Sequence, residues 1–357
     1  MSATDPSPFP PVGIVGYGLY IPDTYLSAED IAAQSGGRWT ADAVRNKLGF
    51  DRKPVPGPGD GTQDMGVKAA LDCLERTGVD PMSIDVILCI GEEHKEYPLT
   101  TSGIYIQEQI GARHAWAIDL QQRCNTTVAA LKIARDMLVA DPDLETALIV
   151  GGYRNGDFID FEDPTTSFMY NLGAGAGAFL VKKNHDANEI LGVQIATDGS
   201  MARDVGVRYG GTVHPIERLP EEVLQKVRRD GNKTLTVFEP EHMKDTLNGI
   251  GFTKWMACLD RALAQSALTR ADLGYLNILH FKPSMFHALL DELGLTEAQS
   301  VYLRRYGHIG QVDQMISVHE GLEQGRLRDG HVMAMLAAGI GYVWGVALVR
   351  WGPRPTA

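Results

Sequence analysis

One cysteine lies where the sequence changes from an apolar strand pattern to a helical pattern. Residues 115–120 form a short apolar segment, and after a polar turn Val128, Leu131 and Ala134 recur at helical spacing. Cys124 falls at the break between the two. A thiol at the start of a helix meets unpaired backbone N–H groups and the positive end of the helix dipole, and both favour the thiolate. Because thiolates attack acyl groups, Cys124 is predicted to be the nucleophile of an acyl-transferring, carbon–carbon bond-forming enzyme.

The other three cysteines lie in different contexts. Cys89 is inside the apolar run 85–91, and Cys73 and Cys258 lie within helical patterns. We interpret all three as small buried hydrophobic residues. No pair has the C-x-x-C spacing of a structural zinc site or a redox pair, and four cysteines in 357 residues do not make a disulfide framework. The sequence therefore predicts no metal site.

Length and composition limit the class of protein. A chain of 357 residues exceeds the size at which one core usually stops growing, so two domains or two fused halves are expected. The formal net charge of -12 argues against nucleic acid or an anionic membrane as the main partner. No apolar run approaches the roughly 20 residues of a membrane helix. The start of the sequence is polar and Pro-rich, without a signal core, so a cytoplasmic protein is expected.

Apolar strands alternate with amphipathic helices, which favours a parallel or mixed sheet covered on both faces. The predicted strands are 11–21, 85–91, 115–120, 146–152, 174–181, 189–197, 275–281, 331–336 and 342–351, and the predicted helices are those beginning near 27, 62–77, 105–110, 125–139, 252–267, 284–293 and 312–323. The same order occurs twice, which predicts two similar α/β halves, 1–184 and 185–357. Residues 201–242 break the pattern, and such stretches are binding loops, lids or solvated excursions.

Five stretches, in this order along the chain, resemble the thiolase-like condensing enzymes and most closely their ketoacyl-acyl-carrier-protein synthase III branch. They are the opening GIVGYGLYIP, Asp119–Cys124, Asn171–Ala178, Ala196–Ser200 and the closing Gly339–Arg350. The resemblance implies a five-layered αβαβα thiolase-like fold of two duplicated halves, and a homodimer. It places the nucleophile at Cys124 in the N-terminal half.

The same resemblance implies the remaining site residues. A catalytic histidine at the end of a second-half strand matches His280, and a polar residue in a later Gly-x-x-x loop matches His308, where 308 − 280 = 28 fits the spacing. The synthase III branch usually carries Asn there, and the resulting Cys–His–His set is similar to that of the elongating ketosynthases. A neutral imidazole can donate one hydrogen bond as an amide does, but it also titrates. The implied oxyanion donors are the backbone N–H groups of Cys124 and Gly341.

The implied reaction is acylation of Cys124 by a thioester, followed by decarboxylative Claisen condensation with a malonyl-type thioester, in fatty-acid or polyketide biosynthesis, with no cofactor. His280 and His308 would stabilise the enolate. Two catalytic alternatives remain open: transfer of the acyl group from Cys124 to an alcohol or amine, and a condensation similar to that of hydroxymethylglutaryl-coenzyme A synthases, with Glu93 as acid/base. Glu93 equally fits a charged loop at a dimer face. A third alternative is a non-catalytic partner subunit.

Substrate delivery rests on two further positions. Trp39 matches a tryptophan that stacks on coenzyme A in the synthase III branch, but the arginine expected near 165–169 is absent, which leaves acyl-coenzyme A and acyl-carrier-protein thioesters both open as donors. Tyr97 resembles a position from which a partner subunit lines the acyl pocket. The glycines of 173–177 run into a strand rather than a helix, so they predict close strand packing and no dinucleotide site.

Overall fold

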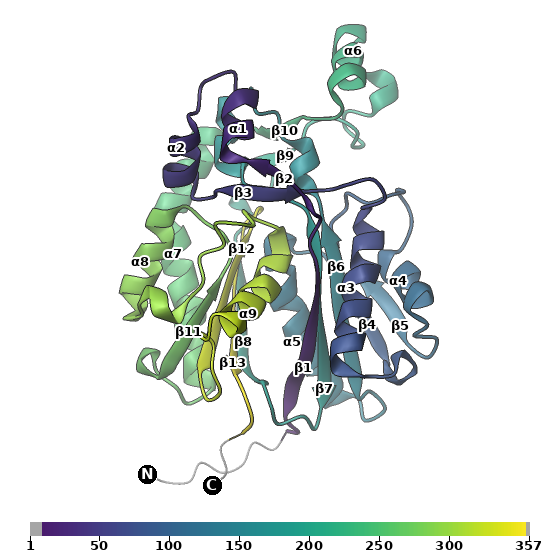
Figure 1. Cartoon of the computed structure of the whole chain (residues 1–357), viewed down its shortest axis with the longest axis vertical. Helices are drawn as coiled ribbons and strands as arrows, with labels where there is room; N and C mark the ends of the chain where they lie inside the picture. Colours follow the sequence, from purple (N-terminus) through teal and green to yellow (C-terminus); the bar gives the residue numbers. More distant parts are fainter. Residues whose placement is uncertain (1–8, 355–357) are drawn as a thin grey trace.

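The computed structural model describes residues 9–354, and within them nine strands form one mixed sheet (Figure 1). Its order is β11-β12-β13-β8-β1-β7-β6-β4-β5. The strands are β1 (Val12–Tyr20), β4 (Val86–Cys89), β5 (Trp116–Asp119), β6 (Thr146–Tyr153), β7 (Gly175–Lys183), β8 (Glu189–Thr197), β11 (Leu273–Ile278), β12 (Val332–Gly339) and β13 (Val343–Arg350).

The strand order repeats between the two ends of the sheet. β1, β7 and β6 are antiparallel neighbours, and β6 is parallel to β4; likewise β8, β13 and β12 are antiparallel neighbours, and β12 is parallel to β11. The two half-sheets join through the pairing of β1 with β8 at Gly13 and Glu189. This repeat is what a duplicated α/β half produces. The boundary at 184/185 stays a prediction, and it falls between β7 and β8.

Helices fill the space between the half-sheets and cover their outer faces, which gives the predicted αβαβα layers (Figure 1). α5 and α9 contact strands of both half-sheets, α3 and α4 cover the N-terminal half, and α7 and α8 cover the C-terminal half. The helices are α1 (Ala28–Gln34), α2 (Ala41–Ala43), α3 (Thr62–Thr77), α4 (Ser102–Ile110), α5 (Thr126–Ala140), α6 (Glu221–Asp230), α7 (Pro240–Gln265), α8 (Pro283–Leu293) and α9 (Asp313–Glu323).

Side-chain alternation along the strands explains the layers. In β6, Ala147 and Ile149 pack into the central layer, and Leu148 and Val150 pack against α3 and α4. Every residue of β6 is buried, as expected for a strand with both faces covered. Among residues 9–354, no helix is both long and apolar enough to cross a membrane. The residues at the start of the chain that suggested a cytoplasmic protein lie mostly outside this range.

Sequence and structure differ most at the start of one helix. The helix predicted at 252–267 begins at Pro240. Proline is acceptable there because the backbone N–H groups of the first helical turn have no carbonyl acceptor within the helix. The segment 37–50 forms the short α2 and a π-helical turn, Val44–Leu48, that ends at Gly49 with φ +88°. Ser27 and Asp30 form a capping box at the start of α1.

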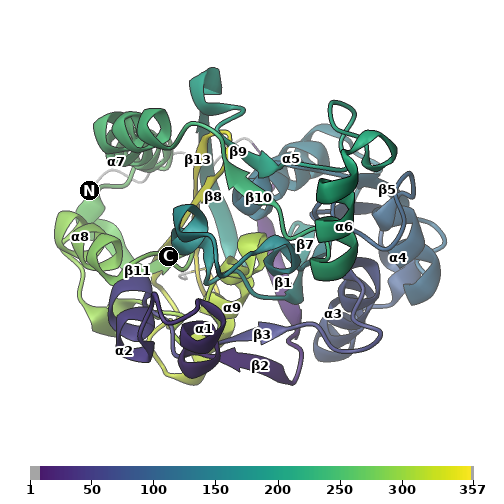
Figure 2. The same cartoon turned by 90° about the horizontal axis from the view of Figure 1, so that it is seen from above.

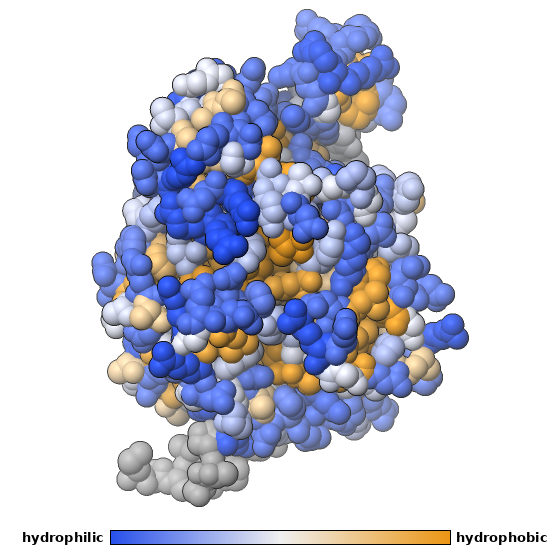
Figure 3. All heavy atoms as spheres, in the orientation of Figure 1, coloured by the Kyte–Doolittle hydropathy of each residue, from blue (hydrophilic) through white to orange (hydrophobic). Residues whose placement is uncertain are grey.

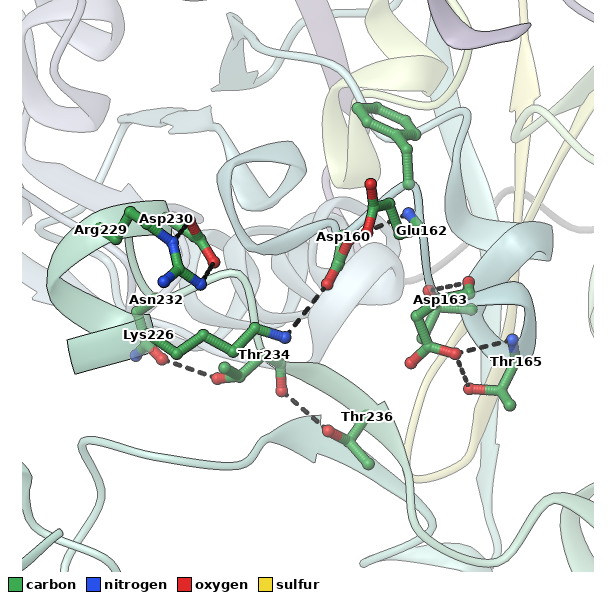
Figure 4. Close-up of polar contacts among 12 residues, drawn as sticks. Asp160, Glu162, Asp163, Thr165, Lys226, Arg229, Asp230, Asn232, Thr234 and Thr236 are labelled. Carbon is green, nitrogen blue, oxygen red and sulfur yellow. Dashed lines mark hydrogen bonds and ion pairs between the residues drawn. The ribbon is translucent and has the colours of Figure 1, made fainter. Parts of the chain in front are cut away.

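The irregular stretch 201–242 forms a protruding excursion above the sheet. It contains β9 (Val205–Val207), β10 (Leu235–Val237) and α6, which projects from the body (Figure 1) and, seen from above, lies on the same side of the molecule as α3 and α4 (Figure 2). Lys226 of α6 points to Asp160, with Nζ 3.6 Å from Oδ2 (Figure 4). The surface of α6 is mostly hydrophilic, whereas apolar side chains gather in a hollow at the middle of the molecule (Figure 3). Two short strands, β2 (Thr24–Ser27) and β3 (Arg52–Val55), form a separate hairpin-like pair below α1.

Candidate active site

Cys124 lies in a 3-10 turn, Arg123–Asn125, directly before α5. It is 9% exposed, against 0–2% for Cys73, Cys89 and Cys258. Burial raises the pKa of Cys73 and of Cys89 to about 12, so these two remain thiols. The sulfur of Cys124 lies 3.2 Å from Nε2 of His308. The structure therefore pairs the predicted nucleophile with one of the two predicted histidines.

The other ring nitrogen of His308 binds a carboxylate. His308 Nδ1 lies 2.6 Å from Asp313 Oδ2, and Asp313 is fully buried at the start of α9. Its oxygens also accept the backbone N–H groups of Ile309, at 2.7 Å, and of His280, at 2.8 Å. Burial alone would lower the pKa of His308, but the charges of Asp313 and Cys124 outweigh it and raise that pKa well above its usual value. The Asp313 carboxylate therefore favours the protonated, imidazolium form of the ring.

This arrangement is a Cys124–His308–Asp313 triad, in which the carboxylate fixes the orientation of the imidazole and stabilises its charge. The sequence analysis did not single out Asp313. Two signals were available: Asp313 follows His308 by five residues, 313 − 308 = 5, and it begins a predicted helix, where an aspartate is common.

His280 makes different contacts from those expected of an enolate-binding histidine. The Asn171 amide nitrogen lies 2.9 Å from His280 Nδ1, and Gly49 O lies 3.1 Å from Nε2. Since an amide nitrogen can only donate, Nδ1 accepts and Nε2 carries the proton that goes to Gly49. Burial lowers the pKa of His280 to about 4. His280 is therefore neutral with both ring nitrogens occupied, and its backbone N–H serves Asp313.

The loop that carries His308 is fixed by backbone pairing with the segment before β7. His308 N–H donates to Asn171 O, and Gly173 N–H donates to His308 O, both at 2.9 Å. Gly310 has φ +56°, and a Cβ there would lie 2.4 Å from the ring of Tyr153. A larger residue at 310 would displace that ring, which explains why this position is a glycine.

The predicted oxyanion donor Gly341 lies in the turn between β12 and β13, which packs on the cysteine turn. A Cβ at Gly339 would lie 2.8 Å from Gln122 O and 3.0 Å from Arg123 Cβ. Within residues 9–354, no acceptor pairs with the Gly341 N–H. Its role as an oxyanion donor, together with the Cys124 N–H, stays a prediction.

Glu93 is the exposed member of a pair of glutamates that share one arginine. Arg123 Nη2 lies 3.2 Å from Glu93 Oε2, and Arg123 Nη1 lies 2.9 Å from Glu92 Oε2. The Glu93 side chain is 66% exposed, whereas that of Glu92 is 4% exposed. The buried carboxyl of this loop is thus Glu92, which was not among the candidate residues predicted from the sequence.

Trp39 lines a cavity of about 390 Å³. Its other lining residues are Asn46, Lys47, Leu48, Ser167, Phe168, Lys282, Pro283 and Ser284. The cavity combines an aromatic ring with two lysines, which suits the adenine, pantetheine and phosphate groups of a thioester carrier.

Tyr97 is 70% exposed, and Leu99 in the same loop is fully exposed with φ +75°, so neither side chain packs in its own chain. In the described part of the chain, no cluster of side chains could hold a metal ion.

Comparison with known proteins gives a consistent result. The family described as 3-oxoacyl-[acyl-carrier-protein] synthase III matches residues 118–199, and its C-terminal family matches residues 263–351. The β-ketoacyl-[acyl-carrier-protein] synthase III of Desulfitobacterium hafniense is 25% identical over 346 residues, which cover 96% of this chain and 98% of the relative.

Solved structures show the same fold. The 3-oxoacyl-[acyl-carrier-protein] synthase III of Aquifex aeolicus superposes with a TM-score of 0.80 at 19% identity, covering 95% of this chain and all of the other. A priming β-ketosynthase of a polyketide biosynthetic pathway gives 0.79 at 22% identity, covering 99% of this chain and all of the other.

Proposed function

Since the chain belongs to the 3-oxoacyl-acyl-carrier-protein synthase III family of thiolase-like condensing enzymes, and is an acyltransferase of that class, we propose that it moves an acyl group from a thioester, through Cys124, to the hydroxyl or amino group of an acceptor. The observation that carries this choice is the Cys124–His308–Asp313 triad, with both nitrogens of His280 occupied elsewhere.

The first half-reaction forms the acyl-cysteine. The Cys124 sulfur attacks the thioester carbonyl carbon, and the imidazolium of His308 favours the attacking thiolate. Backbone N–H groups, for which Cys124 and Gly341 are the candidates, stabilise the tetrahedral oxyanion. The carbon–sulfur bond of the donor then breaks, and the departing thiolate takes the proton of His308. The products are acyl-Cys124, a free thiol and a neutral His308.

The second half-reaction releases the acyl group. Neutral His308 accepts the proton of an acceptor O–H or N–H through Nε2 as the oxygen or nitrogen attacks the acyl carbon. Asp313 stabilises the imidazolium that forms, so the Cys124 thiolate leaves next to a positive charge. The product is an ester or amide, and the thiolate–imidazolium pair is restored.

Decarboxylative condensation is the second candidate, favoured by the match to the synthase III family. It produces an enolate whose oxygen needs strong hydrogen-bond donors. His308 could supply one, but His280 donates its ring proton to Gly49 O instead. Non-decarboxylating condensation through Glu93 is less favoured, because that carboxylate is largely exposed and paired with Arg123.

A two-step product assay separates these candidates. The pure protein is incubated with a panel of acyl thioesters, and the mass of the Cys124 peptide identifies the donor. The acyl-enzyme is then given either an alcohol or amine panel or malonyl thioester with a labelled carboxyl group. An ester or amide without labelled carbon dioxide supports the proposal. Labelled carbon dioxide with a 3-oxoacyl product refutes it in favour of condensation.

We also propose a homodimer formed through the edge strand β5. This strand ends the sheet, and its Trp116 and Ile118 are 48% and 42% exposed. Ile104 of the adjacent α4 is 54% exposed, and Lys95 of the loop with Tyr97 and Leu99 lies 3.4 Å from Asp119 at the end of β5. An unpaired apolar edge strand is a surface that a second copy can cover by continuing the sheet.

The acyl donor, either acyl-coenzyme A or an acyl-carrier protein, would enter through the cavity at Trp39.

A further inference from the structure

The residue directly before the nucleophile has an unusual backbone conformation. Arg123 has φ +54°, in the left-handed region that is costly for a residue with a Cβ. Two hydrogen bonds of the Thr126 hydroxyl close this turn: it donates to Arg123 O at 2.5 Å and accepts from Gln122 N–H at 2.9 Å. The direction in which Cys124 leaves the turn depends on this conformation, so something must stabilise it.

The Arg123 side chain is tied to two carboxylates of unequal burial. Glu92, just after β4, is almost fully buried and lies 2.9 Å from the guanidinium, whereas Glu93 is exposed at 3.2 Å. Burial raises the pKa of Glu92, and the charge of Arg123 acts in the opposite direction. Removing Arg123 would leave the buried Glu92 carboxyl without a compensating charge, whereas Glu93 is exposed to water, so Glu92 is the carboxylate that depends on this pair.

Glu92 also connects to the wall behind His308. The side chain of Asn155 is close enough to Glu92 and to the hydroxyl of Tyr153 to lower the pKa of both groups. The Tyr153 ring is buried against Gly310 and lies 6.2 Å, centroid to centroid, from the ring of His308. One network of contacts thus runs from the turn that holds the sulfur to the loop that holds the imidazole.

We infer that Glu92 and Arg123 are positioning residues for the nucleophile: the ion pair between the buried Glu92 and the partly exposed Arg123 holds the left-handed turn that places the Cys124 sulfur at 3.2 Å from His308. The inference rests on Cys124 as the nucleophile of the proposed function. The groups that face Glu92 are Arg123, Glu93 and Asn155, with Tyr153 beyond Asn155. A thiolate–imidazolium pair depends on close alignment, so a small rotation of the turn is enough to weaken it.

The test compares Glu92→Gln with Glu93→Gln, two isosteric changes on the same guanidinium. The readout is the rate of Cys124 alkylation by iodoacetamide between pH 5 and 9, followed by the mass of the Cys124 peptide. Loss of positioning moves the rate–pH profile of Glu92→Gln to higher pH and slows alkylation at pH 6 at least tenfold. Glu93→Gln should stay within twofold of the wild type. Simple removal of a negative charge would move the profile to lower pH, and that result, or equal profiles for the two variants, overturns the inference.

A second pair isolates the backbone. Glycine adopts φ +54° without strain, so Glu92→Gln/Arg123→Gly should alkylate at least fivefold faster at pH 6 than Glu92→Gln/Arg123→Ala, although both lack the guanidinium. Equal rates for these two doubles, with near-ultraviolet circular dichroism equal to that of the wild type, also overturn the inference. Alkylation requires no acyl acceptor. Normal alkylation in a protein that never acylates would therefore count against the proposed function and leave this inference intact.

Discussion

The environment of His280 predicts a specific acid sensitivity. The folded protein takes up a proton on His280 only near pH 4, whereas the unfolded chain does so near the ordinary value of 6.5. Between these values the unfolded state binds more protons, so the stability that the neutral ring contributes is complete above pH 6.5 and is lost as the pH falls towards 4. Replacing His280 by glutamine, which does not titrate, should remove this loss.

The size of the effect follows from the two pKa values. At pH 7 the difference in protonation destabilises the folded state by about 0.2 kcal/mol, and at pH 5 by about 2 kcal/mol. The wild type should therefore lose about 2 kcal/mol more than His280→Gln between these two pH values. Glutamine cannot fill the ring's place between Phe50 and Tyr302, so the variant should start about 1–3 kcal/mol less stable at pH 7.

The assay is urea unfolding at pH 7, 6 and 5, with stability extrapolated from each curve. His287→Gln is the matched control, because it removes a histidine whose side chain is half exposed on α8 and does not contact His280. His280→Gln should also still form the acyl-Cys124 adduct. A variant that loses stability as steeply as the wild type would mean that the folded protein protonates His280 readily, and the locked, neutral ring described above would be incorrect.

Three further predictions follow from the site and the sheet. Cys124→Ala should abolish the acyl mass adduct while the melting temperature stays within a few degrees; an adduct on another residue would refute the assignment. Asp313→Asn removes the charge that raises the pKa of His308, so acyl transfer should fall about 10²–10⁴-fold, and alkylation of Cys124 at pH 6 at least tenfold. Unchanged alkylation would contradict the triad. Trp116→Glu places a charge on the β5 edge and should give a monomer in analytical ultracentrifugation, whereas Glu108→Lys on α4, a change at an already charged position, should keep the dimer.

Much of the fold could be read from the sequence because its strands are buried on both faces. The apolar run 146–152 became β6, and the polar turn around Cys124 became a 3-10 turn before α5. The helix 312–323 was placed within a residue of α9. Helix starts were less accurate where tertiary contacts decide, as at Pro240, since the first turns of α7 lie beside the excursion rather than on the sheet. The homodimer and the cytoplasmic location remain predictions.

The site was harder to predict, because pattern identifies residue types but not their partners. Cys124 and His308, which the family resemblance identified, lie 3.2 Å apart. The role of His280 depends on Asn171 and Gly49, which are 109 and 231 residues away in the sequence, and no local pattern reveals such contacts. Asp313 was overlooked because an aspartate at a helix start is usually a cap, and here it binds an imidazole instead.

The short segment after β11 contributes both to the catalytic triad and to the cavity at Trp39. The amide of His280 steadies the carboxylate of Asp313, and two residues later Lys282 and Pro283 form one wall of the cavity at Trp39. One stretch of chain, 280–283, therefore contacts both the proposed binding site of the donor and the Asp313 carboxylate that orients His308. If a carrier binds at the proposed cavity and displaces Lys282, we expect the displacement to reach the His280 amide, two peptide bonds away, and through it the Asp313 carboxylate that orients His308.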